Sequence, residues 1–169
     1  MKISITARQI ILFFLSVILN LYCLQAISAE GHNGKDKEST CPVSAIYDGF
    51  SRGDLEPAIM LMADNVRWIH PGDKNLIPFA GVFVSPDGVR EFFNQAISSL
   101  ENLGQKIDSC ITQGNKTAVI GEESYRVVST GKTYFTRWVH LYTIEKGLVT
   151  EFEEFADTAA IAEAFSGGE

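Results

Sequence analysis

The sequence predicts an α+β fold, in which three helices come first and an antiparallel sheet follows. In the first half of the chain apolar residues recur at helical spacing, as on Val43, Ile46 and Phe50. From Gln105 onward, four segments rich in strand-forming residues are separated by short turns. Short turns join antiparallel neighbours, and one face of such a sheet must be covered, which the leading helices can do.

The first 29 residues have the layout of a secretory signal peptide. They contain the basic residues Lys2 and Arg8, then an apolar stretch over 10–23, and they end at the small residue Ala29. The stretch is shorter than the roughly 20 apolar residues that span a bilayer. We therefore expect a periplasmic or secreted protein with no stable membrane anchor. An uncleaved anchor is the alternative.

The rest of the chain is long enough for one domain with its own core. Residues 30–40 contain no bulky apolar side chain, so we expect a disordered leader there and a domain over 41–166. Residues 1–29 hold two of the 14 Lys and Arg residues and none of the 21 Asp and Glu residues, so the remainder is more acidic than the full chain, whose net charge is −7. An acidic surface repels phosphate backbones, and we expect no nucleic-acid partner.

Two cysteines fall within this domain, Cys41 and Cys110. In an oxidising compartment they can pair and close a long loop. The alternative is a pair of buried free thiols.

Proline, glycine and serine residues predict where the elements of the chain begin and end. Pro42 suits the first turn of a helix that ends at Gly53, and Ser85 with Pro86 opens the third helix. Between them, Pro and Gly predict a long loop over 70–85. The other expected elements are a helix over 54–63, a strand over 66–69, strands over 105–112, 117–128, 133–144 and 148–156, and a closing helix over 158–165.

Several motifs resemble ketosteroid isomerases and SnoaL-like polyketide cyclases. The stretch YDGFSRGDLEPAIMLMADNVRWIHPG (47–72) resembles their opening, with helices that end at Gly-Asp and Ala-Asp pairs. PFAG (78–81), GVREFF (88–93) and RWVHLYTIEKGLVTEFEEFAD (137–157) resemble the later segments. The resemblance covers about residues 42–165 and implies a nuclear transport factor 2-like fold, which is a cone-shaped, strongly bent antiparallel sheet with three helices enclosing a pocket.

The resemblance also implies site residues. His70 stands where the isomerases place the aspartate that moves the proton, and a histidine can do similar acid–base work near neutral pH. The alternative is a strand-end histidine bonded to a loop carbonyl. Glu154 lies close to the acid/base aspartate of the cyclases, and burial of a carboxylate raises its pKa. A second isomerase acid falls on His140, or on Val139 if the hairpin turn has the same length.

The residues expected to line the pocket follow from the same resemblance and from the alternation of side chains along strands. The isomerase tyrosine falls on Ile46 or Tyr47. Alternation puts Trp138, His140 and Tyr142 on one face, which lines the pocket or, alternatively, packs on a dimer partner. The candidate ligand-binding residues are Tyr47, Trp68, Phe79, Phe92, Trp138, Tyr142 and Phe152.

The sequence favours an exported pocket protein that binds a small, mostly apolar molecule. General acid–base chemistry of the isomerase, cyclase or hydrolase kind, without a cofactor, is one hypothesis, and a non-catalytic ligand-binding or protein-interaction module is the alternative. His70, His140 and Glu154 would suffice for a metal, but they have no recognisable spacing, so no metal is expected. A homodimer through the open face of the sheet is expected, because that face carries apolar side chains.

Overall fold

The computed structural model describes residues 41–167. The expected signal peptide (1–29) and leader (30–40) lie outside the described residues, so this division of the chain stays a prediction. No helix of the described part is long and apolar enough to cross a membrane.

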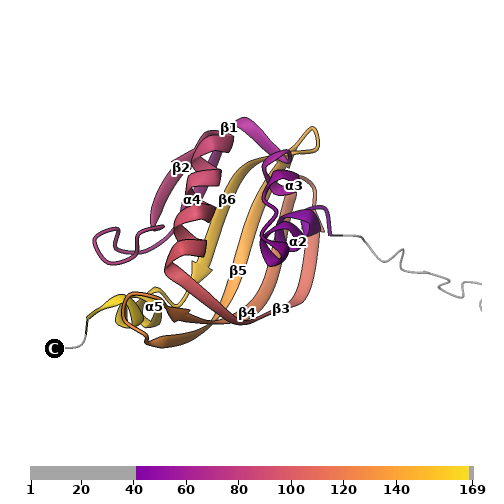
Figure 1. The fold of residues 1–169 in the computed structure, drawn as a ribbon. Coiled ribbons are helices and arrows are strands. Elements are labelled where there is room, and N and C mark those ends of the chain that lie inside the picture. Colours follow the sequence, from indigo (N-terminus) through magenta and orange to yellow (C-terminus); the bar gives the residue numbers. More distant parts are fainter. Residues whose placement is uncertain (1–40, 168–169) are drawn as a thin grey trace, which may run out of the picture. The chain divides into compact units, whose positions relative to one another are not determined.

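A six-stranded sheet in the order β2-β1-β6-β5-β4-β3 forms the framework of the domain (Figure 1). Strands β3 to β6 run antiparallel to their neighbours in sequence, β1 pairs with β6 in parallel, and β2 pairs with β1 in antiparallel fashion. The strands are β1 (Met62–His70), β2 (Gly81–Val84), β3 (Leu100–Gln113), β4 (Lys116–Val127), β5 (Thr133–Glu145) and β6 (Leu148–Ala156). The expected α+β class and bent sheet are confirmed, and the sheet is antiparallel except for the β1–β6 pair.

Three helices, α2 (Ser44–Arg52), α3 (Glu56–Ile59) and α4 (Ser85–Ser99), lie over one face of this sheet (Figure 1). Helix α2 ends because Gly53 adopts a left-handed conformation with φ of 68°, which glycine tolerates without strain. A short helix α5 (Thr158–Phe165) follows the last strand, and the Asp157 side chain caps its first turn by accepting a hydrogen bond from the Ala160 amide.

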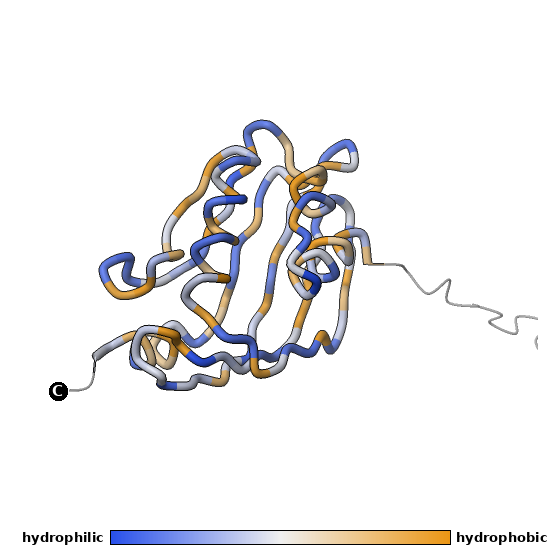
Figure 2. The backbone as a smooth tube through the Cα atoms, in the orientation of Figure 1, coloured by the Kyte–Doolittle hydropathy of each residue, from blue (hydrophilic) through white to orange (hydrophobic). Residues whose placement is uncertain are grey.

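The core lies between the sheet and these helices. Buried and partly exposed residues alternate along β4, which leaves Tyr125 and Val127 facing the helices and Ser124 and Arg126 facing away. Figure 2 shows that hydrophobic and hydrophilic positions are interspersed along the strands instead of being separated by segment. At the centre, the rings of Trp68 and Phe152 stack 3.7 Å apart.

The observed elements differ from those expected at several places. The second helix stops at Ile59, because Met62 already pairs with Val149 in the sheet. The loop over 70–85 contains strand β2, which the sequence analysis missed because four residues beside Pro and Gly carry little periodic signal. Strand β3 begins at Leu100, five residues before the strand expected over 105–112.

A disulfide joins Cys41 to Cys110. It ties the segment just before α2 to the edge strand β3 across 69 residues of sequence. The interpretation as two free thiols is therefore wrong for this structure.

Candidate functional site

A cavity of about 80 Å³ lies between the sheet and helices α2 and α4. That volume is several times what one water molecule requires. The described residues that line it are mostly aromatic and include no Lys or Arg. They are Ile46, Tyr47, Phe50, Trp68, His70, Phe79, Phe92, Phe93, Ala96, Leu100, Gln105, Glu123, Tyr125, Tyr134, His140, Tyr142, Phe152 and Glu154.

His70 and Glu154 meet because of the parallel pairing of β1 with β6. Trp68 pairs with Phe152, so the residues two positions further along each strand face the same cavity side by side. The His70 Nε2 atom lies 2.6 Å from Glu154 Oε2, and both side chains are at least nine-tenths buried. The two residues form a hydrogen-bonded pair inside the cavity wall.

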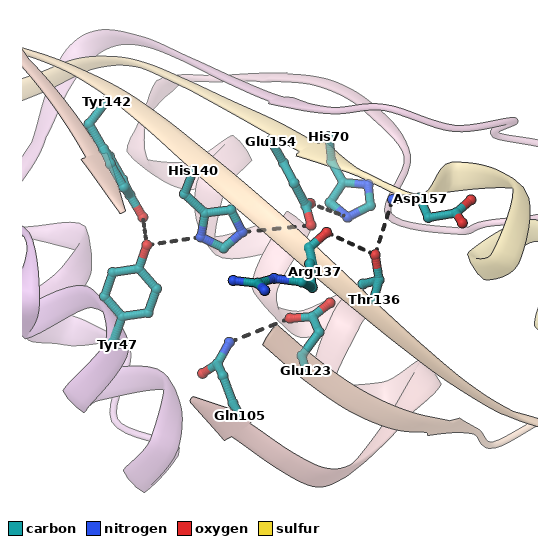
Figure 3. A network of polar contacts seen from close by, with 10 residues as sticks. All are labelled: Tyr47, His70, Gln105, Glu123, Thr136, Arg137, His140, Tyr142, Glu154 and Asp157. Atoms are coloured by element: carbon teal, nitrogen blue, oxygen red, sulfur yellow. Dashed lines mark hydrogen bonds and ion pairs between the residues drawn. The ribbon is translucent and has the colours of Figure 1, made fainter. Parts of the chain in front are cut away.

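His140 reaches the same carboxylate from the other side. It is the direct partner of Glu154 in the β5–β6 register, and its Nε2 atom lies 3.6 Å from Glu154 Oε1. Glu154 therefore lies between two imidazole rings (Figure 3).

Two tyrosines extend this row. The Tyr142 hydroxyl donates to the Tyr47 oxygen over 3.0 Å, so the Tyr47 proton is directed to His140 Nδ1, 2.9 Å away. With Nδ1 accepting, the proton of a neutral His140 lies on Nε2 and faces Glu154. Figure 3 shows the resulting row of Tyr142, Tyr47, His140, Glu154 and His70, which we call the tyrosine–histidine–glutamate row.

The charge state of Glu154 follows from its neighbours. Burial alone raises the pKa of this carboxyl, but the charges and hydrogen bonds of His70 and His140 outweigh burial and leave the pKa below its ordinary value. The expectation of a raised pKa is therefore wrong, because the sequence analysis did not include the two histidines as partners. Burial raises the pKa of Tyr47 and of Tyr142, so both hydroxyls keep their protons.

A second acid faces the cavity from β4. Glu123 is 8% exposed, and its Oε2 atom lies 3.5 Å from the Gln105 side-chain nitrogen. Burial, and then the charge of Glu154, raise the pKa of Glu123 to about 8. The cavity thus holds one carboxyl that is ionised and one that is protonated at neutral pH.

His70 has one ring atom that no described residue satisfies. Its ring lies against Phe79 and Phe92, with centroid distances of 4.9 and 5.5 Å. With Nε2 directed at Glu154, the buried Nδ1 atom has no hydrogen-bond partner. In a neutral ring this atom carries a lone pair.

The structure brings nine of the ten predicted site residues to the cavity. His70, His140 and Glu154 form the row described above, and Tyr47 rather than Ile46 joins it by a hydrogen bond. The remaining residues of the nine, Trp68, Phe79, Phe92, Tyr142 and Phe152, line the walls.

Trp138 is the exception. It lies on the same strand face as His140, but it is buried and does not line the cavity. A Cβ atom on Gly121 of the next strand would come within 2.5 Å of the indole ring, so the ring takes the space that a side chain at Gly121 would fill. Its ring stacks on His140 at 3.9 Å, so Trp138 packs against a residue of the row.

The sequence analysis did not identify four polar lining residues, Gln105, Glu123, Tyr125 and Tyr134. Strand alternation was the available signal, since Glu123, Tyr125 and Val127 share one face of β4. Among residues 41–167, no group of three or more His, Cys, Asp or Glu side chains is arranged to hold a metal ion.

Comparisons with known proteins place this geometry in a family. The model of the SnoaL-like domain matches residues 43–152. A search of curated proteins found no match. Among solved structures, an NTF2-like protein from Burkholderia xenovorans LB400 is 27% identical, with a TM-score of 0.66 over 74% of this chain and 93% of that one.

Two further structures show the same similarity. An NTF2-like protein of unknown function from Burkholderia pseudomallei K96243 is 26% identical, with a TM-score of 0.68 over 75% of this chain and 95% of that one. TerC, co-crystallised with polyporic acid, is 27% identical, with a TM-score of 0.63 over 73% and 95% of the two chains. With a family model that spans most of the described domain, the chain belongs to the SnoaL-like domain family.

Proposed function

We propose that this protein binds a small, mostly apolar molecule in the cavity and catalyses proton transfer on it, as an isomerase, cyclase or hydrolase would. The observation that carries the proposal is the buried contact of His70 with Glu154 in the wall of an aromatic cavity. Perturbed, paired acids and bases in a cleft are candidates for acid–base catalysis.

The roles follow from the hydrogen bonds. His70 presents a free Nδ1 lone pair while Glu154 accepts from Nε2, so His70 is suited to act as the base. Glu154 fixes the ring orientation and, being ionised, stabilises the imidazolium that forms when His70 takes a proton. His140 lies beside the other carboxylate oxygen and accepts a hydrogen bond from Tyr47, which gives the row a path for a proton.

The walls indicate the class of ligand. Aromatic rings from β1, α4 and β6 surround the row, so the ligand needs an apolar, preferably flat, body. The co-crystal of TerC with polyporic acid supports an aromatic molecule that carries oxygen substituents. A non-catalytic binding module with the same ligand is the second candidate, since the aromatic walls alone would serve it.

Hydrogen–deuterium exchange tests the catalytic role. Acetophenone, a small aromatic ketone, is expected to exchange its methyl protons faster in deuterated buffer with the protein than without it, because a base held beside an enolisable carbon accelerates proton removal. Glu154→Gln is expected to lower this rate by about 10²–10⁴-fold, the usual contribution of a positioned acid–base group. Proton NMR of the methyl signal measures the rate.

Glu153→Gln is the matched control, since Glu153 follows the opposite face of β6, and it should leave the exchange rate unchanged. Binding of acetophenone without accelerated exchange would support the non-catalytic candidate. An absence of both binding and exchange would contradict the proposed function.

We also propose that two copies pair through the outer face of the sheet. Ile111, Phe135 and Phe155 are 56%, 58% and 50% exposed on strands β3, β5 and β6. The register puts Ile120, Val139 and Phe155 in one row across this face, and a monomer would leave that row in water. A second copy is the simplest surface of matching character.

Phe155→Lys is expected to convert a dimer into a monomer, because it places a charge in the middle of this row. Sedimentation velocity measures the change. Val84→Lys, at an equally exposed position on the edge strand β2, should leave the dimer intact. A wild-type protein that sediments as a monomer at high concentration would remove the proposal.

Export to the periplasm or the medium is a further proposal, which rests on the layout of residues 1–29. The Cys41–Cys110 disulfide supports it, because such bonds persist in oxidising compartments. Intact-mass measurement of the exported protein tests it, and a full-length mass would contradict it.

A further inference from the structure

Glu123 occupies a part of the cavity that the tyrosine–histidine–glutamate row does not use. It lies on β4, opposite Thr136 in the β4–β5 register, whereas Glu154 on β6 lies opposite His140. Both carboxyls nevertheless line one cavity, because the sheet is bent around it. The two acids thus face the same space from different positions along the sheet.

Two tyrosines accompany Glu123. Tyr125 follows it on the same face of β4, and Tyr134 is the cross-strand partner of Tyr125, with ring centroids 5.9 Å apart. Both line the cavity, and among the described residues neither hydroxyl has a hydrogen-bond partner. Figure 3 shows Glu123 with its partner Gln105 beside the tyrosine–histidine–glutamate row.

These groups are hydrogen-bond donors at neutral pH. Burial raises the pKa of Tyr125 and of Tyr134, and the pKa of Glu123 is about 8. The Gln105 side-chain amide is the one described group that hydrogen-bonds the Glu123 carboxyl, with its nitrogen 3.5 Å from Oε2. The other carboxyl oxygen is therefore free to bond a ligand.

We propose that Glu123, Tyr125 and Tyr134 form a second polar subsite, which donates hydrogen bonds to an uncharged oxygen of the ligand and thereby selects neutral carbonyl or ether compounds. The inference rests on the proposed function, since it assigns the orientation and charge class of the same ligand. Anions are disfavoured because Glu154 is ionised and no Lys or Arg lines the described cavity. Cations are disfavoured while Glu123 keeps its proton.

The titratable groups around this subsite come from every element that borders it. They are Glu154 on β6, His140, Tyr134 and Tyr142 on β5, Tyr125 on β4, His70 on β1 and Tyr47 on α2. The tyrosines stay protonated through neutral pH. Ionisation of Glu123, whose pKa is about 8, is therefore expected to change the charge of this subsite above neutral pH.

The affinity for acetophenone should therefore depend on the protonation of Glu123. With a pKa of about 8 for Glu123, the dissociation constant is expected to rise about tenfold between about pH 7 and pH 9. In Glu123→Gln the amide remains a donor and cannot ionise, so the dissociation constant should stay within about threefold of wild type at neutral pH and be flat above it. Titration by NMR chemical shifts measures both.

Glu122→Gln is the matched control, because the neighbouring side chain follows the outer face of β4. It should retain the wild-type pH dependence. Protonated 1-phenylethylamine, in which an ammonium replaces the carbonyl, should bind more than tenfold more weakly than acetophenone at about pH 7, since the protonated groups of this subsite offer its ammonium no negative charge.

The outcomes separate the two proposals. If acetophenone binds and Glu123→Gln shows the same pH dependence of binding as wild type, the subsite is overturned while the pocket is kept. Equal binding of the amine and of acetophenone would have the same consequence. Absence of binding to wild type and to Glu122→Gln at every pH would overturn the proposed function together with the subsite. Carbon NMR of the ligand-free protein adds a direct measurement of the Glu123 titration. We expect a carboxyl signal whose titration midpoint lies near pH 8 and which is missing in Glu123→Gln. A midpoint near the ordinary pKa of a glutamate would overturn the subsite.

Discussion

Replacement of both Cys41 and Cys110 by alanine is expected to lower the free energy of unfolding by about 4 kcal/mol. The disulfide closes a loop across 69 residues, and a cross-link of that span removes much of the conformational freedom of the unfolded chain. It also connects the segment just before α2 to the edge strand β3, two parts of the chain that are far apart in sequence.

Denaturant unfolding of oxidised wild type and of the double variant measures this difference. A reductant should destabilise the wild type to the level of the variant and leave the variant unchanged, which separates the effect of the bond from that of the two side chains. A loss below about 1 kcal/mol would show that the unfolded chain gains little freedom when the bond is absent.

Glu123→Gln is expected to stabilise the folded protein increasingly as the pH rises. The pKa of Glu123 is about 8 in the folded protein, whereas the ordinary value of a glutamate is 4.5. Between these two values the folded state binds a proton that the unfolded state has lost, so wild-type stability falls with rising pH. The glutamine variant has no such proton.

The difference in unfolding free energy between variant and wild type should grow by about 1.4 kcal/mol per pH unit, or roughly 3 kcal/mol between about pH 5.5 and pH 7.5. Taking the difference cancels the contributions of all groups that the two proteins share. Glu122→Gln should show no such slope, and a constant difference for Glu123→Gln would mean that Glu123 titrates as an ordinary surface carboxyl.

Glu154 acts in the opposite direction. Its pKa is below the ordinary value, so the stability that it contributes is present above the ordinary pKa and is lost as the pH falls toward the lower folded one. The two buried glutamates therefore limit the stability of the domain from opposite sides of the pH range.

Much of the site could be predicted from the sequence, because its residues lie at positions that chain order defines. His70 ends the first strand and Glu154 lies on the last one, and both were identified by their match to a family pattern. Strand alternation also put His140 and Tyr142 on one face. These are local properties, which depend on side-chain type and on the two-residue period of a strand.

The contacts between these residues could not be predicted in the same way. That His70 meets Glu154 depends on the parallel register of β1 with β6, and a shift of one residue would turn either side chain to the other face. The predicted direction of the Glu154 pKa shift was wrong for the same reason, because the shift depends on partners from two other strands.

The sequence by itself determined the α+β class, the order of most elements and the family, because periodicity, turn residues and motif spacing are local properties of the chain. Only the tertiary structure decided that Glu123 and not Glu122 faces the cavity, that Gly121 leaves room for the Trp138 ring, and that Cys41 bonds Cys110. The physical reason is that burial, charge partners and bond formation depend on distances in space, which strand register and sheet curvature set together.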